Sequence, residues 1–153
     1  MSNTTSFSPS DALLLDKQLC FALYSSSLAM TKLYKPLLDK LGLTYPQYLV
    51  MLVLWENDHQ SVSDLGTRLF LDSGTLTPLL KRMENSGWLA RHRSQDDERC
   101  VIISLTDNGK ALRNTAQHIP AYLMETSGCT LPELTTLTIE LQKLRGRLNA
   151  CHE

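Results

Sequence analysis

The sequence predicts a mainly helical fold: a winged helix-turn-helix, flanked by helices from both ends of the chain that join two copies of the protein. Two short amphipathic helices and a charged hairpin follow one another between residues 61 and 106. Apolar helical segments lie on both sides, and 153 residues with 42% hydrophobic content suit a single domain. We therefore expect residues 46–106 to form the winged helix-turn-helix, and residues 10–41 and 108–150 to form the dimerisation helices.

The first long helix is expected to begin after Ser10 or Asp11, because either side chain accepts hydrogen bonds from the free N–H groups that open a helix. Pro36 and Gly42 predict a break and then a short helical piece that ends near residue 41. The apolar face consists of Leu15, Leu19, Ala22, Leu23, Met30 and Leu33. This face is broad enough to need cover from more than one side, which a second chain would supply.

Pro46 is expected to open the next helix, because proline is favoured in the first turn, where a helix makes no use of its N–H. The residues expected to be buried are Leu49, Leu52, Val53 and Trp55. With these residues buried, the helix would support the two helices that follow it.

The first helix of the helix-turn-helix is predicted over residues 62–69. Its apolar residues, Val62, Leu65 and Leu69, recur at helical spacing. Ser61 or Ser63 is placed to cap its free N–H groups. Residues 70–72 then form a short connection to the second helix.

Asp72 is placed to cap a second helix, whose apolar stripe consists of Leu76, Leu79, Leu80 and Met83. The opposite face is small, polar and basic, and carries Gly74, Thr75, Thr77, Pro78, Lys81, Arg82 and Asn85. Small residues allow close approach to a DNA major groove, and hydroxyl, amide and basic groups reach bases and phosphates. The alternative is a solvated surface helix. Pro78 removes one backbone hydrogen bond inside this helix, and a local bend near Gly74 would relieve the clash.

Gly87 is expected to end the second helix, and strands over residues 88–93 and 100–105 then form a hairpin. The connecting loop, SQDDER, holds three acids beside Arg99. It is either a solvated hairpin tip or an arrangement in which a carboxylate holds the arginine for DNA. Because the hairpin directly follows a helix-turn-helix, a DNA-contacting wing is favoured.

Further helices are expected beyond the hairpin. Asp107 is placed to cap the first, and Pro120 should bend or interrupt it before Gly128 ends it. Thr130 and Glu133 form a capping-box pattern for the last helix. Its heptad-like seam consists of Leu134, Leu137, Leu141, Leu144 and Leu148. One helix of the same chain would satisfy this seam, but together with the apolar first helix it favours a homodimer.

Composition narrows the class of protein. The net charge is -1 at pH 7, and basic and acidic residues are equal in number between residues 61 and 106, so a DNA-binding surface depends on their placement. The chain has neither a run as long as a membrane span nor a secretory signal, so we expect a cytoplasmic protein without membrane contact. The four cysteines lack the C-x-x-C pairs of zinc sites, so no metal or other cofactor is expected. By default each is a buried thiol; Cys100 is expected to pack in the wing, and Cys151 to be exposed without a role.

The hairpin and the residues after it resemble the D-x-R wing and L-T-x-x-G helix start of MarR-type transcription regulators. The matching residues are Asp97, Arg99, Val101, Leu105, Thr106 and Gly109. From Leu14 to Leu148, the stretches LTYPQYLVMLVLWE at 43–56 and LDSGTLTPLLKRME at 71–84 are similar to the organic hydroperoxide regulators (OhrR) of that family. This resemblance and the helix face imply a homodimer that binds operator double-stranded DNA. The residues expected to contact it are Ser73, Thr75, Thr77, Pro78, Lys81, Arg82, Arg93, Asp97 and Arg99.

The same resemblance implies a redox site. In those regulators a cysteine near the start of the first helix reacts with organic hydroperoxides, and two tyrosines donate hydrogen bonds to it; Cys20, Tyr34 and Tyr45 match these positions. Fourteen residues separate Cys20 from Tyr34, about 21 Å of helix rise, so these two side chains would meet only across a dimer. Cys129 matches the second cysteine of the two-cysteine branch, which forms an intersubunit disulfide with the first.

The resulting hypothesis is a transcriptional repressor, not an enzyme, whose reduced dimer binds operator DNA. Oxidation of Cys20 by an organic hydroperoxide, followed by a disulfide to Cys129, would release the DNA. In one alternative, a non-covalent aromatic acid regulates a MarR-type repressor, and Cys20 is only packing. In the other, the protein is a thiol peroxidase that consumes peroxide through both cysteines, although such an enzyme has no need of a wing.

Overall fold

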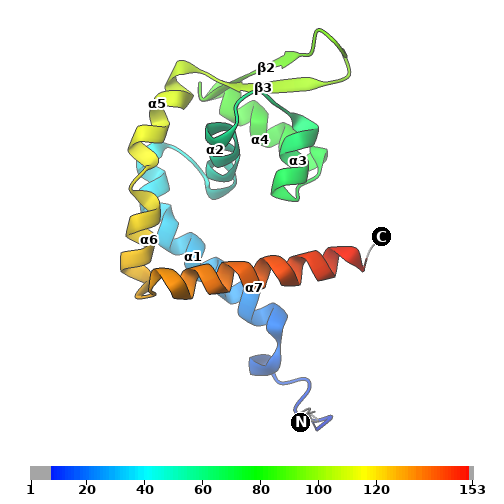
Figure 1. Ribbon diagram of the computed structural model, residues 1–153, viewed down its shortest axis with the longest axis vertical. Coiled ribbons are helices and arrows are strands. Elements are labelled where there is room, and N and C mark those ends of the chain that lie inside the picture. The colour runs from blue at the N-terminus through cyan, green and yellow to red at the C-terminus, as the bar shows by residue number, and fades with distance from the viewer. Residues whose placement is uncertain (1–7, 152–153) are drawn as a thin grey trace. The chain divides into compact units, whose positions relative to one another are not determined.

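The computed structural model describes residues 8–151 and is mainly helical, with one small antiparallel sheet (Figure 1). The chain divides between Tyr45 and Pro46 into two compact units. The first unit holds the N-terminal helix, and the second holds a helix pair, the sheet and the C-terminal helices. The predicted fold class is therefore confirmed. No helix in the described part of the chain is long and apolar enough to cross a membrane.

The first unit contains a short 3-10 turn, η1 (Leu15–Lys17), and one long helix, α1 (Leu19–Leu41). The predicted break at Pro36 is wrong: α1 runs through this residue and ends at Gly42, whose left-handed backbone (φ 73°) stops it. A proline removes one hydrogen bond, and the intact turns on either side of it keep a 23-residue helix continuous.

The long helix also begins later than predicted, because the chain is extended at Gln18 instead of helical from Ser10 or Asp11 onward. The side-chain amide of Gln18 donates hydrogen bonds to the carbonyl oxygens of Ala12 (2.7 Å) and Leu14 (2.9 Å). These two bonds hold a turned segment ahead of the helix. They are made to carbonyls four and six residues away, so no regular helical spacing signals them.

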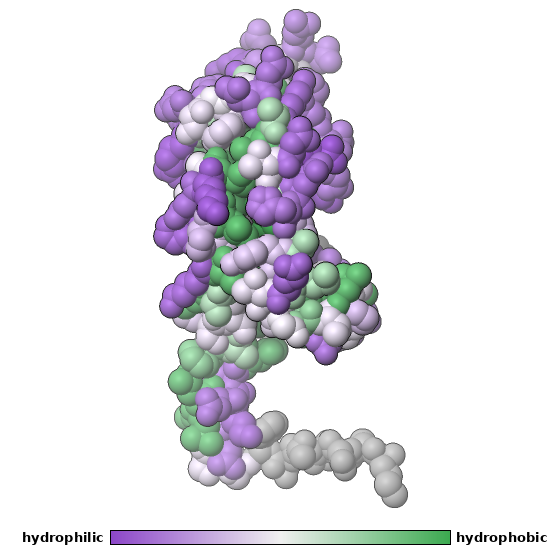
Figure 2. Space-filling view, turned by 90° about the vertical axis from the view of Figure 1, so that its left-hand side faces the viewer, coloured by the Kyte–Doolittle hydropathy of each residue, from purple (hydrophilic) through white to green (hydrophobic). Residues whose placement is uncertain are grey.

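Hydrophobic side chains gather on the surface of this turned segment and of the first half of α1, the stretch that leads away from the grey terminus in Figure 2. The exposed ones are Leu13, Leu14, Leu15, Leu19, Phe21, Tyr24, Leu28 and Met30. An apolar surface of this extent is typical of an interaction site. The prediction that a second chain covers α1 stays a prediction.

The second unit is built on α2 (Tyr45–Glu56), most of which is buried. Its buried residues are Gln47, Tyr48, Val50, Met51, Val53 and Leu54. Burial is confirmed for Val53, whereas Leu49 and Trp55 are half-buried and Leu52, at 40% exposure, was predicted wrongly. The apolar residues of this helix lie on all of its faces, so its sequence has no polar face that would show which side points inward.

The helix pair agrees with the prediction. The first helix, α3 (Val62–Leu69), begins with a capping box in which Ser61 and Asp64 exchange hydrogen bonds. Asp72 caps the second helix, α4 (Ser73–Asn85), by accepting a hydrogen bond from the N–H of Thr75 (2.7 Å). The predicted stripe is buried and consists of Leu76, Leu79, Leu80 and Met83. Pro78 stays within one continuous helix.

The sheet has three strands in the order β1-β3-β2, not the two that were predicted. The hairpin strands, β2 (Leu89–Arg93) and β3 (Val101–Leu105), match the prediction, and β1 (Gln60–Ser61) pairs with β3 on its other edge. Because β1 leads directly into α3, this pairing fastens the base of the hairpin to the helix pair. A carboxylate oxygen of Asp58 strengthens the junction by accepting from the N–H of Leu105 (2.9 Å).

Three helices follow: α5 (Asp107–Ala116), α6 (Ile119–Ser127) and α7 (Leu131–Ala150). The predicted interruption near Pro120 is confirmed, because α6 begins one residue before it. The predicted capping box of α7 is confirmed as well. None of residues 131–150 is buried within one chain, and the exposed seam includes Leu137, Leu141 and Leu148.

The start of α5 is joined tightly to the hairpin. Thr106 caps this helix, not Asp107 as predicted: its hydroxyl accepts from the N–H of Gly109 (3.1 Å) and donates to the carbonyl of Gly87 (2.6 Å). A methyl group at Gly109 would collide with the carbonyl oxygen of Trp88. The L-T-x-x-G motif therefore lets α5 begin in contact with the turn that ends α4.

Candidate functional site

The outward face of α4 carries the residues that the sequence singled out. Ser73, Thr75, Pro78, Lys81 and Arg82 are exposed, and Thr77 is half-buried. Asp72 and the hydroxyl groups lie near the N-terminal end of the helix, and the two cations follow along it. A convex face of small and basic residues is complementary to a groove between negatively charged backbones.

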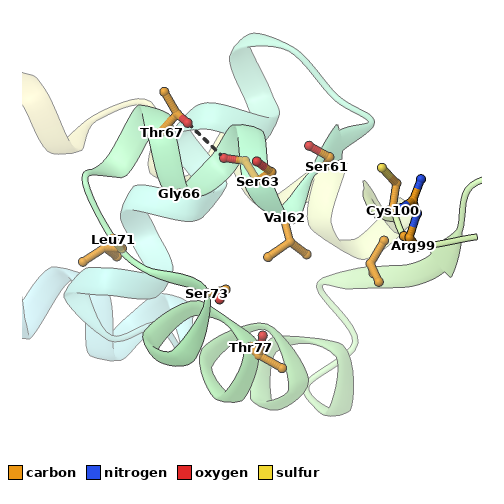
Figure 3. Close-up of a pocket in the computed structure, with 11 residues that line it drawn as sticks. Ser61, Val62, Ser63, Gly66, Thr67, Leu71, Ser73, Thr77, Arg99 and Cys100 are labelled. Atoms are coloured by element: carbon orange, nitrogen blue, oxygen red, sulfur yellow. Dashed lines mark hydrogen bonds between the residues drawn. The ribbon is translucent and has the colours of Figure 1, made fainter. Parts of the chain in front are cut away.

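A hollow of about 570 Å³ lies between α3, α4 and the hairpin (Figure 3). Hydroxyl groups from Ser61, Ser63, Thr67, Ser73 and Thr77 line it, together with Arg99, Cys100 and Val101. Hydroxyl and guanidinium groups are common hydrogen-bond donors to phosphate oxygens. Ser63 and Thr67 of α3 were not predicted as site residues, because the hydrophobic spacing and capping pattern of that helix do not distinguish a DNA-binding hydroxyl from a solvated one.

The hairpin loop orders its own arginines. Both the backbone N–H and the Nε of Arg99 lie close to one carboxylate oxygen of Asp97, at 3.0 and 3.3 Å. The guanidinium of Arg93 donates to the carbonyl of Glu98 (3.1 Å). Arg99 is 92% exposed, so its ion pair contributes little to stability and acts mainly by restricting where the guanidinium points.

A further pair, Glu84 and Arg91, which the sequence did not predict, joins α4 to the first strand of the hairpin. One carboxylate oxygen of Glu84 accepts from the backbone N–H of Arg91 (3.0 Å), and the other accepts from its Nε (3.3 Å) and Nη2 (3.2 Å). These hydrogen bonds lower the pKa of the Glu84 carboxyl. The sequence indicates this pair only by an acid near the end of the predicted helix and an arginine in the strand that follows.

The first unit contains the three residues matched to the peroxide-reacting cysteine and its two tyrosines. Cys20 is exposed in the first turn of α1. The rings of Tyr34 and Tyr45 lie together, with their centroids 5.4 Å apart and an interplanar angle of 47°. Because α1 is continuous, Cys20 and Tyr34 of one chain are separated by about 21 Å of helix rise. Burial raises the pKa of the Tyr45 phenol, so this group remains a hydrogen-bond donor at neutral pH.

Cys129 lies in the junction between α6 and α7. It follows Gly128, which has a left-handed backbone (φ 69°), and precedes Thr130, the N-cap of α7. The thiol is half-buried beside a hollow lined by Pro132, Glu133, Thr136 and Leu137. A cysteine in an irregular junction can move without breaking helical hydrogen bonds.

The default expectation of a buried thiol is wrong for Cys20 and Cys100 and holds only in part for Cys129, whereas the exposure expected for Cys151 is confirmed. Cys20, Cys100 and Cys151 are exposed, and Cys129 is half-buried. Cys100 does not pack as expected, because it precedes β3 on the loop side and borders the hollow next to Arg99. Among residues 8–151, no three His, Cys, Asp or Glu side chains cluster in a way that could hold a metal ion.

Comparisons with known proteins agree with this geometry. A family model described as the transcriptional regulator SarA/Rot matches residues 32–115. The organic hydroperoxide resistance transcriptional regulator of Bacillus subtilis (strain 168) is 52% identical over 139 residues, which is 91% of this chain and 95% of that protein. Reduced AbfR bound to DNA is 42% identical and covers 88% of this chain and 94% of its own, with a TM-score of 0.67. AbfR, from Staphylococcus epidermidis, is also known with its disulfide formed (42% identity, 85% and 91% coverage, TM-score 0.58).

A winged helix-turn-helix that presents a small, basic helix face beside an arginine-bearing hairpin is the architecture of a DNA-binding transcription regulator. Identity of 52% along nearly all of the chain narrows that class further. The chain belongs to the MarR family of these regulators, in its organic hydroperoxide branch.

Proposed function

We propose that the protein is a repressor that senses organic hydroperoxides: the reduced homodimer binds operator DNA, and the oxidised homodimer releases it. One observation carries this proposal. Cys20 is exposed at the start of α1, while Tyr34 lies about 21 Å further along the same helix, with its ring against that of Tyr45 at the start of α2. Two antiparallel copies of α1 would bring each cysteine to the tyrosine pair of the other chain.

The first chemical step takes place at Cys20. Its thiolate attacks one oxygen of the hydroperoxide, the O–O bond breaks, and the other oxygen takes up a proton and leaves as an alcohol. Cys20 is thereby oxidised to a sulfenic acid. Phenol donors from Tyr34 and Tyr45 of the other chain favour the thiolate, which is the nucleophilic form.

The second step uses Cys129. Its thiolate attacks the sulfur of the Cys20 sulfenic acid, an S–S bond forms, the S–O bond breaks, and the leaving hydroxide takes up a proton from solvent to become water. The junction between α6 and α7 allows Cys129 to approach, because its neighbour Gly128 tolerates backbone conformations closed to other residues. AbfR, a relative, is known both reduced on DNA and with a disulfide formed, which supports a redox change of this kind.

Operator DNA is bound by α4 and the hairpin. Lys81 and Arg82 serve the major groove and the DNA backbone, while Arg99, oriented by Asp97, reaches the minor groove or its phosphates. The hydroxyl-lined hollow between them suits a phosphate of the same strand. An intersubunit disulfide shifts the helices that set the spacing of the two α4 helices, and a change of a few ångström misplaces both.

A second candidate, regulation by a non-covalent aromatic acid, has one observation in its favour. Tyr48, Leu52 and Trp55 of α2 line a hollow of about 320 Å³ whose lining also includes Arg113 and Glu56. An aromatic ring would stack there and a carboxylate would meet the guanidinium. Titration of an aromatic acid without oxidant tests this candidate, because release of DNA would then need neither cysteine.

The deciding experiment measures binding to the promoter DNA beside the protein's own coding region, with and without an organic hydroperoxide. Non-reducing electrophoresis of the same samples should show an intersubunit crosslink in the wild type that reductant reverses. Cys20→Ser should bind DNA and ignore peroxide, and Cys129→Ser should stop at a sulfenic acid or a mixed disulfide. Release of DNA without a crosslink, equal in wild type and Cys20→Ser, would overturn the proposal. Sustained peroxide consumption with a reductant would instead indicate a peroxidase.

A further inference from the structure

Phe70 occupies an unfavourable backbone position that its own helix does not explain. It is the C-cap of α3, with a left-handed backbone (φ 57°), and the residue is 57% exposed. Glycine or asparagine adopts this conformation at lower cost than a bulky aromatic residue. An exposed ring in a strained turn therefore indicates that the side chain has a partner.

The partner is Arg145, on α7. Its guanidinium carbon lies 4.3 Å from the centroid of the Phe70 ring, within the range of a cation–π interaction. Figure 1 shows α7 as one helix running below α3 in the second unit. No residue of α7 is buried, so this contact between α7 and the end of α3 lies at the protein surface.

The two ends of α7 connect the redox site to the DNA-reading helices. Cys129 immediately precedes Thr130, the N-cap, and Arg145 lies fourteen residues beyond Leu131, about 21 Å along the helix. A capping box and an unbroken helical backbone make α7 a stiff rod over that length. A displacement of its N-terminal end is therefore transmitted to Arg145.

The turn that receives this displacement is closely packed against both helices. The N–H groups of Phe70 and Leu71 bond to the carbonyl of Gly66, and even a methyl group added at Gly66 would lie 2.7 Å from the Leu71 carbonyl oxygen. Asp72, two residues after Phe70, caps α4. A displacement of the Phe70 backbone would therefore reach the N-terminal end of α4 within two residues.

We propose that Arg145 and Phe70 are positioning residues that carry the effect of a disulfide at Cys129 to α4. This inference rests on the proposed redox function. It predicts that loss of the contact uncouples DNA affinity from oxidation while leaving the disulfide chemistry intact.

The test measures operator affinity of the reduced and the crosslinked dimer for each variant and compares the ratio of the two dissociation constants. Arg145→Ala should lessen the oxidation-linked loss of affinity about two- to fivefold, the effect of one exposed cation–π contact. Phe70→Asn, which suits a left-handed backbone, should do the same, and the double variant should add nothing further. Arg145→Lys should keep the wild-type ratio. Arg147→Ala, an exposed arginine two residues along α7, is the charge-matched control.

The outcomes distinguish failure of the positioning role from failure of the proposed redox function. If the wild type crosslinks and releases DNA but Arg145→Ala and Arg147→Ala show the wild-type ratio, the positioning role is wrong and the proposed function stands. An equal change in both arginine variants would mean that only charge matters, which also overturns the inference. If the wild type neither crosslinks nor releases DNA, the proposed function fails first. Arg145 is exposed, so its substitution leaves the fold intact even if Phe70→Asn does not.

Discussion

Removing the phenol oxygens of the tyrosine pair should slow the first oxidation step without harming the fold. Tyr34→Phe and Tyr45→Phe each keep a ring, so the contact at 5.4 Å between centroids is preserved. Each change removes one proposed hydrogen bond to the Cys20 thiolate, and such a bond to a charged group contributes about 1.5–3 kcal/mol. The rate of sulfenic acid formation should therefore fall roughly 10- to 150-fold per tyrosine.

The assay is the rate of sulfenic acid formation in a Cys129→Ser background, where the reaction stops after the first step. Thermal unfolding of each variant checks that the fold is unchanged. Tyr122→Phe, a change at an exposed tyrosine on α6, is the matched control and should react at the parent rate. Oxidation of the Tyr34→Phe, Tyr45→Phe double variant within twofold of the parent rate would show that the pair does not serve Cys20.

Three further changes test the contact of the hairpin with DNA, the dimer seam of α7, and the hydrogen-bonded pair of Glu84 and Arg91 that joins α4 to the hairpin. Arg99→Ala should weaken operator binding by about 1–3 kcal/mol with no change in melting temperature, because the side chain is exposed; unchanged affinity in a salt titration would refute its role. Leu141→Glu with Leu144→Glu should place unpaired charge in the seam, cost several kcal/mol and yield monomers or unfolded chain; light scattering that finds a folded dimer would place the interface elsewhere. Since Arg91 lowers the pKa of Glu84, their contact contributes fully above the ordinary glutamate pKa of about 4.3 and is lost as pH falls through the lower folded value. Glu84→Gln should thus flatten the acid limb of thermal stability, and an unaltered limb would contradict this.

The parts of the fold that were predicted correctly depend on local patterns. The stripe of α4 and its capping Asp72 follow from spacing and from one side chain near free N–H groups, so neighbours in sequence suffice to predict them. The capping box at Thr130 is local in the same way. By contrast β1 is only two residues long and exists because it pairs with β3, some forty residues later. A pairing of this range leaves no periodic signal in the sequence.

The candidate site was predicted in the same uneven way. The helical spacing of the buried stripe of α4 also identifies the opposite, outward face. The site residues on α4 could therefore be predicted from periodicity. The tyrosine pair came from resemblance, since spacing alone gives no reason for Tyr34 and Tyr45 to meet. Cys100 was misplaced because strand alternation was extended one residue too far, into the loop. The contact of Arg145 with Phe70 depends on the packing of distant helices and lay beyond any local pattern.

The hydroxyl of Thr106 has a consequence for how sharply the protein can respond. By bonding to both Gly87 and Gly109, it joins the end of α4, the hairpin and the start of α5 at one point. In the proposed switch, elements fastened in this way would turn together, so the contacts of α4 and of the hairpin with DNA would be gained or lost in the same motion. A small rotation then removes two sets of contacts at once, and their free energies add in the exponent of the binding constant. The loss of affinity on such a rotation would then be the product of two factors instead of one.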